Sequence, residues 1–343
     1  IKDIKPVPVI RRYTYDDKLP EISGKTVAIF VGAHSNFDSK PEAAIDLFCE
    51  KHNGAVLCDR TSNYHGKYAI FPSIICGQEM YDTPLKSPDL MIHIGEISGA
   101  YLKIQPREVW RVSPDGIVRD YFRKLSNVFE MSEFHFFDLY SEGSGKKNTE
   151  YYLRWNKECE QIRAKIPELP FSNLWIAQKT IDRLPANAVL HVGILNSLRA
   201  WNMFVGPRGL RSYSNTGGFG IDGNTSTLIG ASLANPQQLY FGVVGDLSFF
   251  YDMNSLGIRH VGKNIRLMVV NNGRGTEFRN YSHSAAHLGD RADAYVAAAG
   301  HYGNKSTALI RDYAKALGFK YLSASTKEEY LRHVDEFVSP KVG

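Results

Sequence analysis

The 343-residue sequence has few cysteines, no long apolar run and no segment dominated by one sign of charge. Its four cysteines show no CxxC pairing and no zinc-ligand spacing, which argues against a disulfide framework, a zinc site or a redox role. The apolar runs are too short to cross a bilayer, and the first residues do not have the pattern of a signal peptide, so we expect neither a membrane span nor a leader. Lysine and arginine number 41 against 36 acidic residues, and they are interspersed, so a nucleic-acid or membrane surface is disfavoured. We expect a soluble cytoplasmic protein with reduced thiols.

The hydrophobic content of 43% is sufficient for two domains, each with its own core. In the first half, apolar runs alternate with an amphipathic segment. They predict a helix at 40–53 and strands at 26–32, 54–59, 89–96 and 108–113. This alternation is typical of an α/β fold with a mainly parallel sheet. The loop after the first strand, 31–39, lacks the glycine fingerprint of a dinucleotide site, so we expect a structural domain here.

A second α/β domain is expected after a connector at 141–170, which combines a Gly/Ser/Lys loop with a polar helix. The periodicity predicts strands at 188–193, 239–245, 264–270 and 320–324. It predicts helices at 172–185, 197–205, 226–236, 248–261, 290–303, 306–318 and 326–337. The sequence therefore predicts two three-layer α/β/α domains with mainly parallel sheets.

Two of these strands run directly into small polar groups, Gly245-Asp246 and Asn271-Asn272. If a right-handed helical crossover joins them, the strands are parallel and both groups lie at the same sheet edge, where ligands of open α/β sheets bind. Carboxylate, amide and carbonyl oxygens suit Mg²⁺, which usually also binds phosphate oxygens. The N–H groups of Leu247 and Ser248 would favour an anion. The pattern indicates a Mg²⁺-diphosphate site. The alternative is that Asp246 only caps a helix and the Asn pair only forms a turn.

A competing interpretation starts from "GFGIDG" at Gly218–Gly223, which matches GxGxxG and precedes an expected helix and strand. That order would fit a dinucleotide-binding unit in an NAD(P)-dependent oxidoreductase. Against it, the preceding segment 211–217 is too polar for the buried first strand that such a unit needs. The Asn pair would also have no role.

Residues 218–275 together resemble the pyrophosphate-binding domain of thiamine-diphosphate-dependent enzymes. The signature of these enzymes is a Gly-Asp pair followed by an Asn pair, here with 26 positions between Asp246 and Asn272. The motifs "GIDG", "VGDLS" and "VVNN" most resemble the 2-succinyl-5-enolpyruvyl-6-hydroxy-3-cyclohexene-1-carboxylate synthase family, alongside acetolactate-synthase-like enzymes. The resemblance implies a thiamine-diphosphate-binding fold at 171–343 and a Rossmann-like central domain at 23–140.

The resemblance also implies roles for individual residues. Mg²⁺ would be bound by the side chains of Asp246 and Asn272 and by the backbone carbonyl of Arg274. Ile221 would be the apolar wedge that bends the cofactor and brings its aminopyrimidine to the thiazolium, unless it is an ordinary core residue. A backbone carbonyl near Phe219 would accept a hydrogen bond from the pyrimidine amine. The cofactor-binding set is Asn196, Ser197, Phe219, Gly220, Ile221, Gly245, Asp246, Leu247, Ser248, Asn272, Gly275 and Thr276.

Enzymes of this kind also have a pyrimidine-binding domain, which carries the glutamate that activates the aminopyrimidine. No segment of this sequence fits that domain, so we expect residues 1–22 to be a linker from a missing N-terminal domain or subunit. The resemblance implies a homodimer or higher oligomer that decarboxylates a 2-oxo acid and acts as a carboligase, as a lyase or a transferase. This chain alone would be inactive, and no catalytic residue is assigned. The alternative is a non-catalytic module that holds the cofactor or a partner.

The substrate pocket departs from the synthase pattern. Positions that carry basic residues for carboxylate-rich substrates are Trp201 and Thr216 here, so we expect a different substrate. Residues that could line a different pocket are Arg199, Glu277, Arg279, Tyr281 and His283, although residues of this kind are more often solvated loop residues than substrate contacts. We expect His260 and His301 to be structural.

Overall fold

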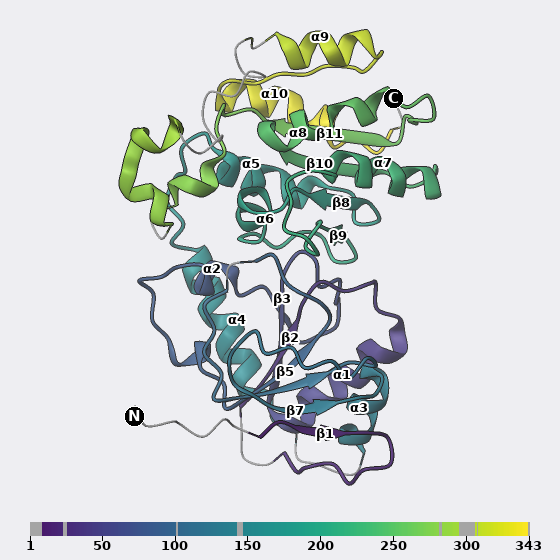
Figure 1. Ribbon diagram of the computed structural model, residues 1–343, viewed down its shortest axis with the longest axis vertical. Helices are drawn as coiled ribbons and strands as arrows, with labels where there is room; N and C mark the ends of the chain where they lie inside the picture. Colours follow the sequence, from purple (N-terminus) through teal and green to yellow (C-terminus); the bar gives the residue numbers. More distant parts are fainter. Residues whose placement is uncertain are drawn as a thin grey trace. The chain divides into compact units, whose positions relative to one another are not determined.

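The computed structural model describes residues 9–22, 26–100, 102–142, 147–280, 283–294, 306 and 308–341 (Figure 1). The chain divides into two compact units, Ile1–Ile166 and Pro167–Gly343. Each unit contains one parallel sheet covered by helices, so the predicted α/β class with mainly parallel sheets is confirmed. None of the helices among the described residues is both long enough and apolar enough to span a membrane.

The first unit is built on a seven-stranded sheet in the order β1-β7-β6-β5-β2-β3-β4, and all of its strand pairs are parallel. Its strands are β1 Arg11–Tyr13, β2 Val27–Val31, β3 Gly54–Cys58, β4 Ala69–Ile70, β5 Leu90–Ile94, β6 Glu108–Val112 and β7 Leu125–Phe129. Its helices are α1 Ser39–His52, α2 Ser73–Cys76, α3 Glu133–Ser141, α4 Glu150–Arg163 and the 3₁₀ helix η1 Pro84–Lys86.

The alternation of side chains along the central strand β2 creates two cores. Val27, Ile29 and Val31 point to the face that α1 and α3 cover. Ala28 and Phe30 point to the opposite face, which α2 and α4 cover. Because successive side chains of a strand point to opposite faces, a strand that is apolar at every position is covered on both sides. This arrangement gives the three layers of the unit.

Two elements of the first unit lie in segments predicted to be a linker or a connector. β1 lies within 1–22 and pairs with β7 at the sheet edge. α4 lies within 141–170 and buries Tyr151, Trp155 and Cys159 against the core that contains Phe30.

The second unit has a four-stranded parallel sheet in the order β11-β10-β8-β9. Its strands are β8 Val189–Val192, β9 Arg211–Tyr213, β10 Tyr240–Gly245 and β11 Ile265–Val270. Its α-helices are α5 Asn173–Thr180, α6 Asn196–Trp201, α7 Asn224–Ala234, α8 Asp246–Asp252, α9 Leu309–Ala316 and α10 Lys327–Phe337. Its 3₁₀ helices are η2 Ile181–Arg183, η3 Met253–Gly257, η4 Thr276–Arg279 and η5 Ser284–Ala294.

Helices cover both faces of this sheet as well. On one face, Tyr240 and Val244 of β10 pack with Leu228 of α7 and Phe249 of α8. On the other face, the ring of Phe241 contacts Phe337 of α10. The strands therefore lie between two helical layers. The helices cover the faces of the sheet, and the loops that follow the strands lie at the sheet edge formed by their carboxyl ends.

Three predictions for this unit need correction. Residues 320–324 do not form a strand, because no strand among the described residues pairs with this segment. Arg211–Tyr213, where no strand was predicted, forms β9 at the edge of the sheet, because an edge strand needs only one paired neighbour and tolerates polar residues. The helix predicted at 248–261 is α8 followed by η3 and ends at Gly257. Most of the helix predicted at 290–303 lies outside the described residues.

Candidate functional site

The ends of β10 and β11 lie at the same level of the sheet. The two strands are parallel, and Gly245 pairs in register with Val270, so Asp246 and Asn271 follow at equivalent positions. The backbone N–H of Gly273 donates to Oδ2 of Asp246 over 2.7 Å. The structure therefore brings Asp246 and the Asn271-Asn272 loop together at the sheet edge.

Asp246 is the first residue of α8 and is only 1% exposed. Its Oδ1 accepts a hydrogen bond from the N–H of Leu247 over 2.9 Å, so this N–H is bound to the carboxylate. Burial of an ionised carboxylate is costly unless hydrogen bonds and a cation compensate it. Each carboxylate oxygen can accept more than one bond, so both can still reach a cation.

The loop after β11 presents neutral oxygen donors beside this carboxylate. The side chains of Asn271 and Asn272 are exposed, and Oδ1 of Asn272 accepts from the N–H of Arg274 over 3.1 Å. The turn from Asn272 to Arg274 depends on Gly273, whose φ of 72° lies in the left-handed region. This hydrogen bond is the one expected if the Asn pair only forms a turn. The side-chain amide of Asn272 is nevertheless exposed, so it is also accessible to a ligand.

The donor set fits Mg²⁺ better than a soft metal. Among the described residues, no group of three or more His, Cys, Asp and Glu side chains is placed to hold a metal ion. The residues at this edge instead offer one carboxylate, an amide oxygen and backbone carbonyls. Such a set leaves several positions of an octahedral Mg²⁺ for phosphate oxygens and water. The residues present therefore fit a Mg²⁺ ion that is shared with a diphosphate.

A second link connects the end of β8 to the same loop. Nδ2 of Asn196, at the start of α6, donates to Oγ1 of Thr276 over 2.7 Å. Ser197 is buried, and its Oγ lies 3.4 Å from Nδ2 of Asn173. The preceding residue Leu195 has φ 69° and ψ −121°, a conformation that non-glycine residues rarely adopt. Backbone strain of this kind concentrates at functional sites.

The "GFGIDG" loop is hydrogen-bonded to the first turn of α8. The carbonyl of Ile221 accepts from Oγ of Ser248 over 2.5 Å and from Nδ2 of Asn224 over 2.8 Å. The same Nδ2 lies 2.9 Å from Oγ of Ser248. Asn224 is buried and was not predicted as a site residue, and its position directly after the glycine motif was the only sequence signal.

The exposure of this loop agrees with a ligand-facing role. Ile221 is half-buried and is absent from the fully buried core, which disfavours the ordinary-core alternative. Phe219 is exposed and has a left-handed φ of 53°. At Gly220 an added Cβ would lie 2.4 Å from Oδ1 of Asp222, an exposed side chain whose rotation can relieve the contact.

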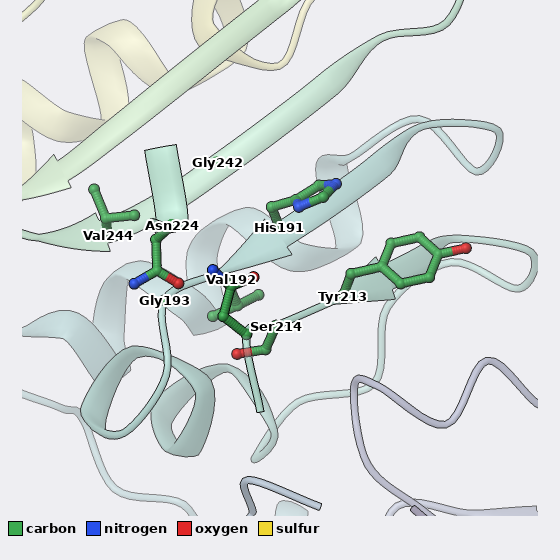
Figure 2. Close-up of a pocket in the computed structure, with 9 residues that line it drawn as sticks. His191, Val192, Gly193, Tyr213, Ser214, Asn224, Gly242 and Val244 are labelled. Atoms are coloured by element: carbon green, nitrogen blue, oxygen red, sulfur yellow. The ribbon is translucent and has the colours of Figure 1, made fainter. Parts of the chain in front are cut away.

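A small recess lies at the ends of β8 and β9, lined by residues that include His191, Tyr213, Ser214, Asn224 and Val244 (Figure 2). It contains no room for a water molecule, so it is a packing feature and not a ligand pocket. Burial lowers the pKa of His191 to about 4, which keeps its ring neutral.

The residues proposed to line a different substrate pocket are engaged in contacts of their own. Arg199 forms an ion pair with Glu277, and Arg279 pairs with Asp290 at 2.9 Å. Nδ1 of His283 accepts from the N–H of Ala285. Tyr281 lies outside the described residues.

The other positions that departed from the synthase pattern are buried. Trp201 is 0% exposed and Thr216 7%. His260 is exposed and accepts from Nε of Arg259, and His301 lies outside the described residues.

The sheet order disfavours the dinucleotide-binding interpretation. A GxGxxG unit requires that the strands before and after the glycine loop be parallel neighbours. Here β9 precedes the loop and β10 follows α7, but β8 lies between them. The "GFGIDG" loop therefore belongs to a different topology.

Comparisons with known proteins agree with these geometric features. No model of a protein family matches the sequence. The chain is similar to 2-succinyl-5-enolpyruvyl-6-hydroxy-3-cyclohexene-1-carboxylate synthases of several bacteria. It is 32% identical to that of Bacteroides fragilis over 238 residues, which covers 69% of this chain and 41% of the relative. It is 34% identical to that of Phocaeicola vulgatus over 236 residues, covering 69% and 40%.

A third relative, from Flavobacterium johnsoniae, is 27% identical over 276 residues, covering 75% of this chain and 48% of the relative. The chain thus spans less than half the length of each of these three curated relatives.

Proposed function

Because the chain belongs to the thiamine-diphosphate-dependent enzyme superfamily, as a homologue of these synthases, we propose that its second unit binds the diphosphate of thiamine diphosphate through Mg²⁺. Asp246, Asn272 and the carbonyl of Arg274 would bind the metal. Asn196, Ser197, Ser248, Gly275 and Thr276 would surround the diphosphate.

The single observation that carries this proposal is the contact between Gly273 and Asp246. It joins the ends of two parallel strands and places a buried carboxylate beside a loop of neutral oxygen donors. The second bond, from Asn196 to Thr276, adds the end of β8 to the same region. Three strand ends thus contribute to one edge, the position where open α/β sheets bind ligands.

The remaining residues of the site would orient the cofactor. Ile221 is proposed to support the bend between its two rings, and the carbonyls near Phe219 and Gly220 to accept from the pyrimidine amine. When bound, thiamine diphosphate supplies the carbanion chemistry for a 2-oxo acid. The protein contributes orientation, metal binding and exclusion of water. The pyrimidine end and its activating glutamate would come from a pyrimidine-binding domain, in the same protein or in another subunit of a dimer.

We propose decarboxylation of a 2-oxo acid with transfer to an acceptor as the reaction class. Trp201 and Thr216 are uncharged and buried, so neither supplies a cation for a substrate carboxylate. We infer that the substrates differ from those bound where these two positions are basic.

Calorimetry on the full chain tests the cofactor proposal. Thiamine diphosphate with Mg²⁺ is expected to bind, and NADH is not. Asp246→Ala is expected to abolish Mg²⁺-dependent binding, whereas Asp182→Ala, which removes an exposed carboxylate of the same unit, should leave it unchanged. NADH binding that survives Asp246→Ala would refute the proposal.

A second experiment separates an enzyme from a non-catalytic module. The chain would be combined with its pyrimidine-binding domain, and a panel of 2-oxo acids would be followed by release of carbon dioxide. Turnover with at least one of them, lost in Asp246→Ala, is expected for the enzyme. Tight cofactor binding without turnover on any 2-oxo acid would favour the module.

A further inference from the structure

Helix α6 and the loop after β11 are joined by two side-chain contacts that run in parallel. Asn196 donates to Thr276, and Arg199 forms an ion pair with Glu277. Asn196 and Arg199 are three positions apart on α6, so their side chains lie on one face of the helix. Their partners Thr276 and Glu277 are consecutive residues of η4.

The position of Glu277 is fixed from its own side of the pair as well. Its Oε2 also accepts from Nδ2 of Asn280 over 3.1 Å, and its backbone carbonyl accepts from the N–H of Asn280. The pair is partly shielded from water, since the side chains of Arg199 and Glu277 are only 25% and 26% exposed. An ion pair of this exposure is screened less by salt than one at the surface.

We propose that Arg199 and Glu277 are positioning residues for the metal, a role that rests on the proposed binding of Mg²⁺ and thiamine diphosphate. The proposed metal donors Asn272 and Arg274 lie in the same loop, only a few residues before Glu277. This loop touches α8 through Gly273 and touches α6 through Thr276 and Glu277. Arg199 therefore acts on the position of this loop beside Asp246 through Glu277.

Neutralising either partner should loosen the loop and raise the Mg²⁺ requirement. For Arg199→Met and for Glu277→Gln we expect the half-saturating Mg²⁺ concentration for thiamine diphosphate binding to rise roughly 10- to 100-fold, the range for residues that orient metal ligands. The double variant should be no worse than the poorer single variant, because both changes break the same pair. The thermal midpoint measured without cofactor should remain that of the unmodified chain.

A matched control is the exposed pair between Arg183 and Asp335, whose side chains are 41% and 79% exposed. Arg183→Met removes the same kind of charge in the same unit, far along the chain from the loop, and should not change the Mg²⁺ requirement.

Three results would overturn the inference. These are an unchanged Mg²⁺ requirement in Arg199→Met and Glu277→Gln, a fall in the cofactor-free midpoint in proportion to the loss of binding, and strictly additive effects in the double variant. If the unmodified chain fails to bind thiamine diphosphate with Mg²⁺, the proposed function itself is wrong, and the inference is rejected with it.

Discussion

The N–H of Gly273 donates a hydrogen bond to the carboxylate of Asp246, with 2.7 Å between the nitrogen and Oδ2, and this bond joins the loops that follow β10 and β11. The direction of this N–H depends on the left-handed conformation of Gly273, with φ at 72°. Only glycine adopts this conformation without steric cost. The contact between the two strand ends is therefore specified by one residue of the "NNGRG" segment.

Gly273→Ala should weaken cofactor binding without unfolding the unit. An alanine in the left-handed region costs roughly 1–2 kcal/mol, so relaxation of the turn would move the N–H away from Asp246. We expect the dissociation constant for thiamine diphosphate with Mg²⁺ to rise about tenfold, as a cost of 1.4 kcal/mol implies. Calorimetry measures it, with Gly257→Ala as control, because nothing lies within 4 Å of a Cβ there. Equal affinities for both variants would contradict the prediction.

Asn224→Asp should separate the hydrogen-bond role of Asn224 from its shape. The change keeps the size of the side chain but removes the N–H groups that face the carbonyl of Ile221 and Oγ of Ser248. Loss of a buried donor costs roughly 1–3 kcal/mol, and the new charge would face a carbonyl oxygen. We expect a lower free energy of unfolding in urea and weaker cofactor binding. Asn215→Asp, at a more exposed bond to Thr227, should have a smaller effect on both quantities.

The sequence predicted those parts of the fold that depend on local pattern. β2, β3 and β10 are continuous apolar runs, and β5 and β11 are each interrupted once, by His93 and Arg266. Such runs are typical of parallel strands, which are covered on both faces. The sequence missed four strands, β1, β4, β7 and β9. β7 is an interior strand of five residues, in which Ser126 and Asn127 interrupt the apolar pattern. The other three are only two or three residues long and lie at sheet edges. Such strands form because a neighbour offers a free edge, and no pattern in three residues records that. Residues 320–324 show the opposite case, because their pattern predicts a strand but no described strand pairs with them.

The site shows the same division. The approach of Asp246 to the Asn271-Asn272 loop was predictable, because two parallel strands joined by a crossover end at one edge. The bonds of Asn224 to Ile221 and Ser248 depend on how two loops pack. The pairing of Arg199 with Glu277 joins segments that are distant in sequence, and it was not foreseen, although both residues had been selected as pocket candidates. Contacts between side chains that are distant in sequence depend on how the elements pack. No local pattern in a single sequence predicts them.

Gly32→Ala should strongly destabilise the first unit. The loops after β2 and β5 are held together by bonds from Gly32 N to the carbonyl of Ile94 and from Glu96 N to that of Ala33. A Cβ on Gly32 would lie 1.7 Å from the backbone oxygen of Glu96. Because backbone must shift, we expect a loss of at least roughly 1–3 kcal/mol in the free energy of unfolding. The exposed helix residue Gly230 is the control, since its change to Ala should stabilise by roughly 0.5–1 kcal/mol. Similar stabilities of the two variants would refute this contact.

His34 should make the first unit less stable as the pH rises above 6.5. Burial disfavours the charged ring, but the hydrogen bond and charge of Glu133 outweigh it, so the pKa of His34 is raised above 6.5. Both ring nitrogens face acceptors, the carbonyl of Ser35 at 2.6 Å and Oε2 of Glu133 at 2.9 Å, and only the protonated ring can donate to both. A raised histidine pKa stabilises the folded state fully below the unfolded value and loses that effect as the pH passes the folded value.

The measurement is the free energy of unfolding in urea between pH 6.5 and 8.5. Burial lowers the pKa of His93 to about 3 and also lowers that of His52, so these two rings titrate mainly below this window. The unmodified chain should lose stability across it, while His34→Gln should show a flatter profile. Glu133→Gln should be intermediate, because it keeps an acceptor for the ring and removes the charge. If His34→Gln retains the slope of the unmodified chain, the pH dependence originates elsewhere, and the ion pair between His34 and Glu133 does not stabilise the fold.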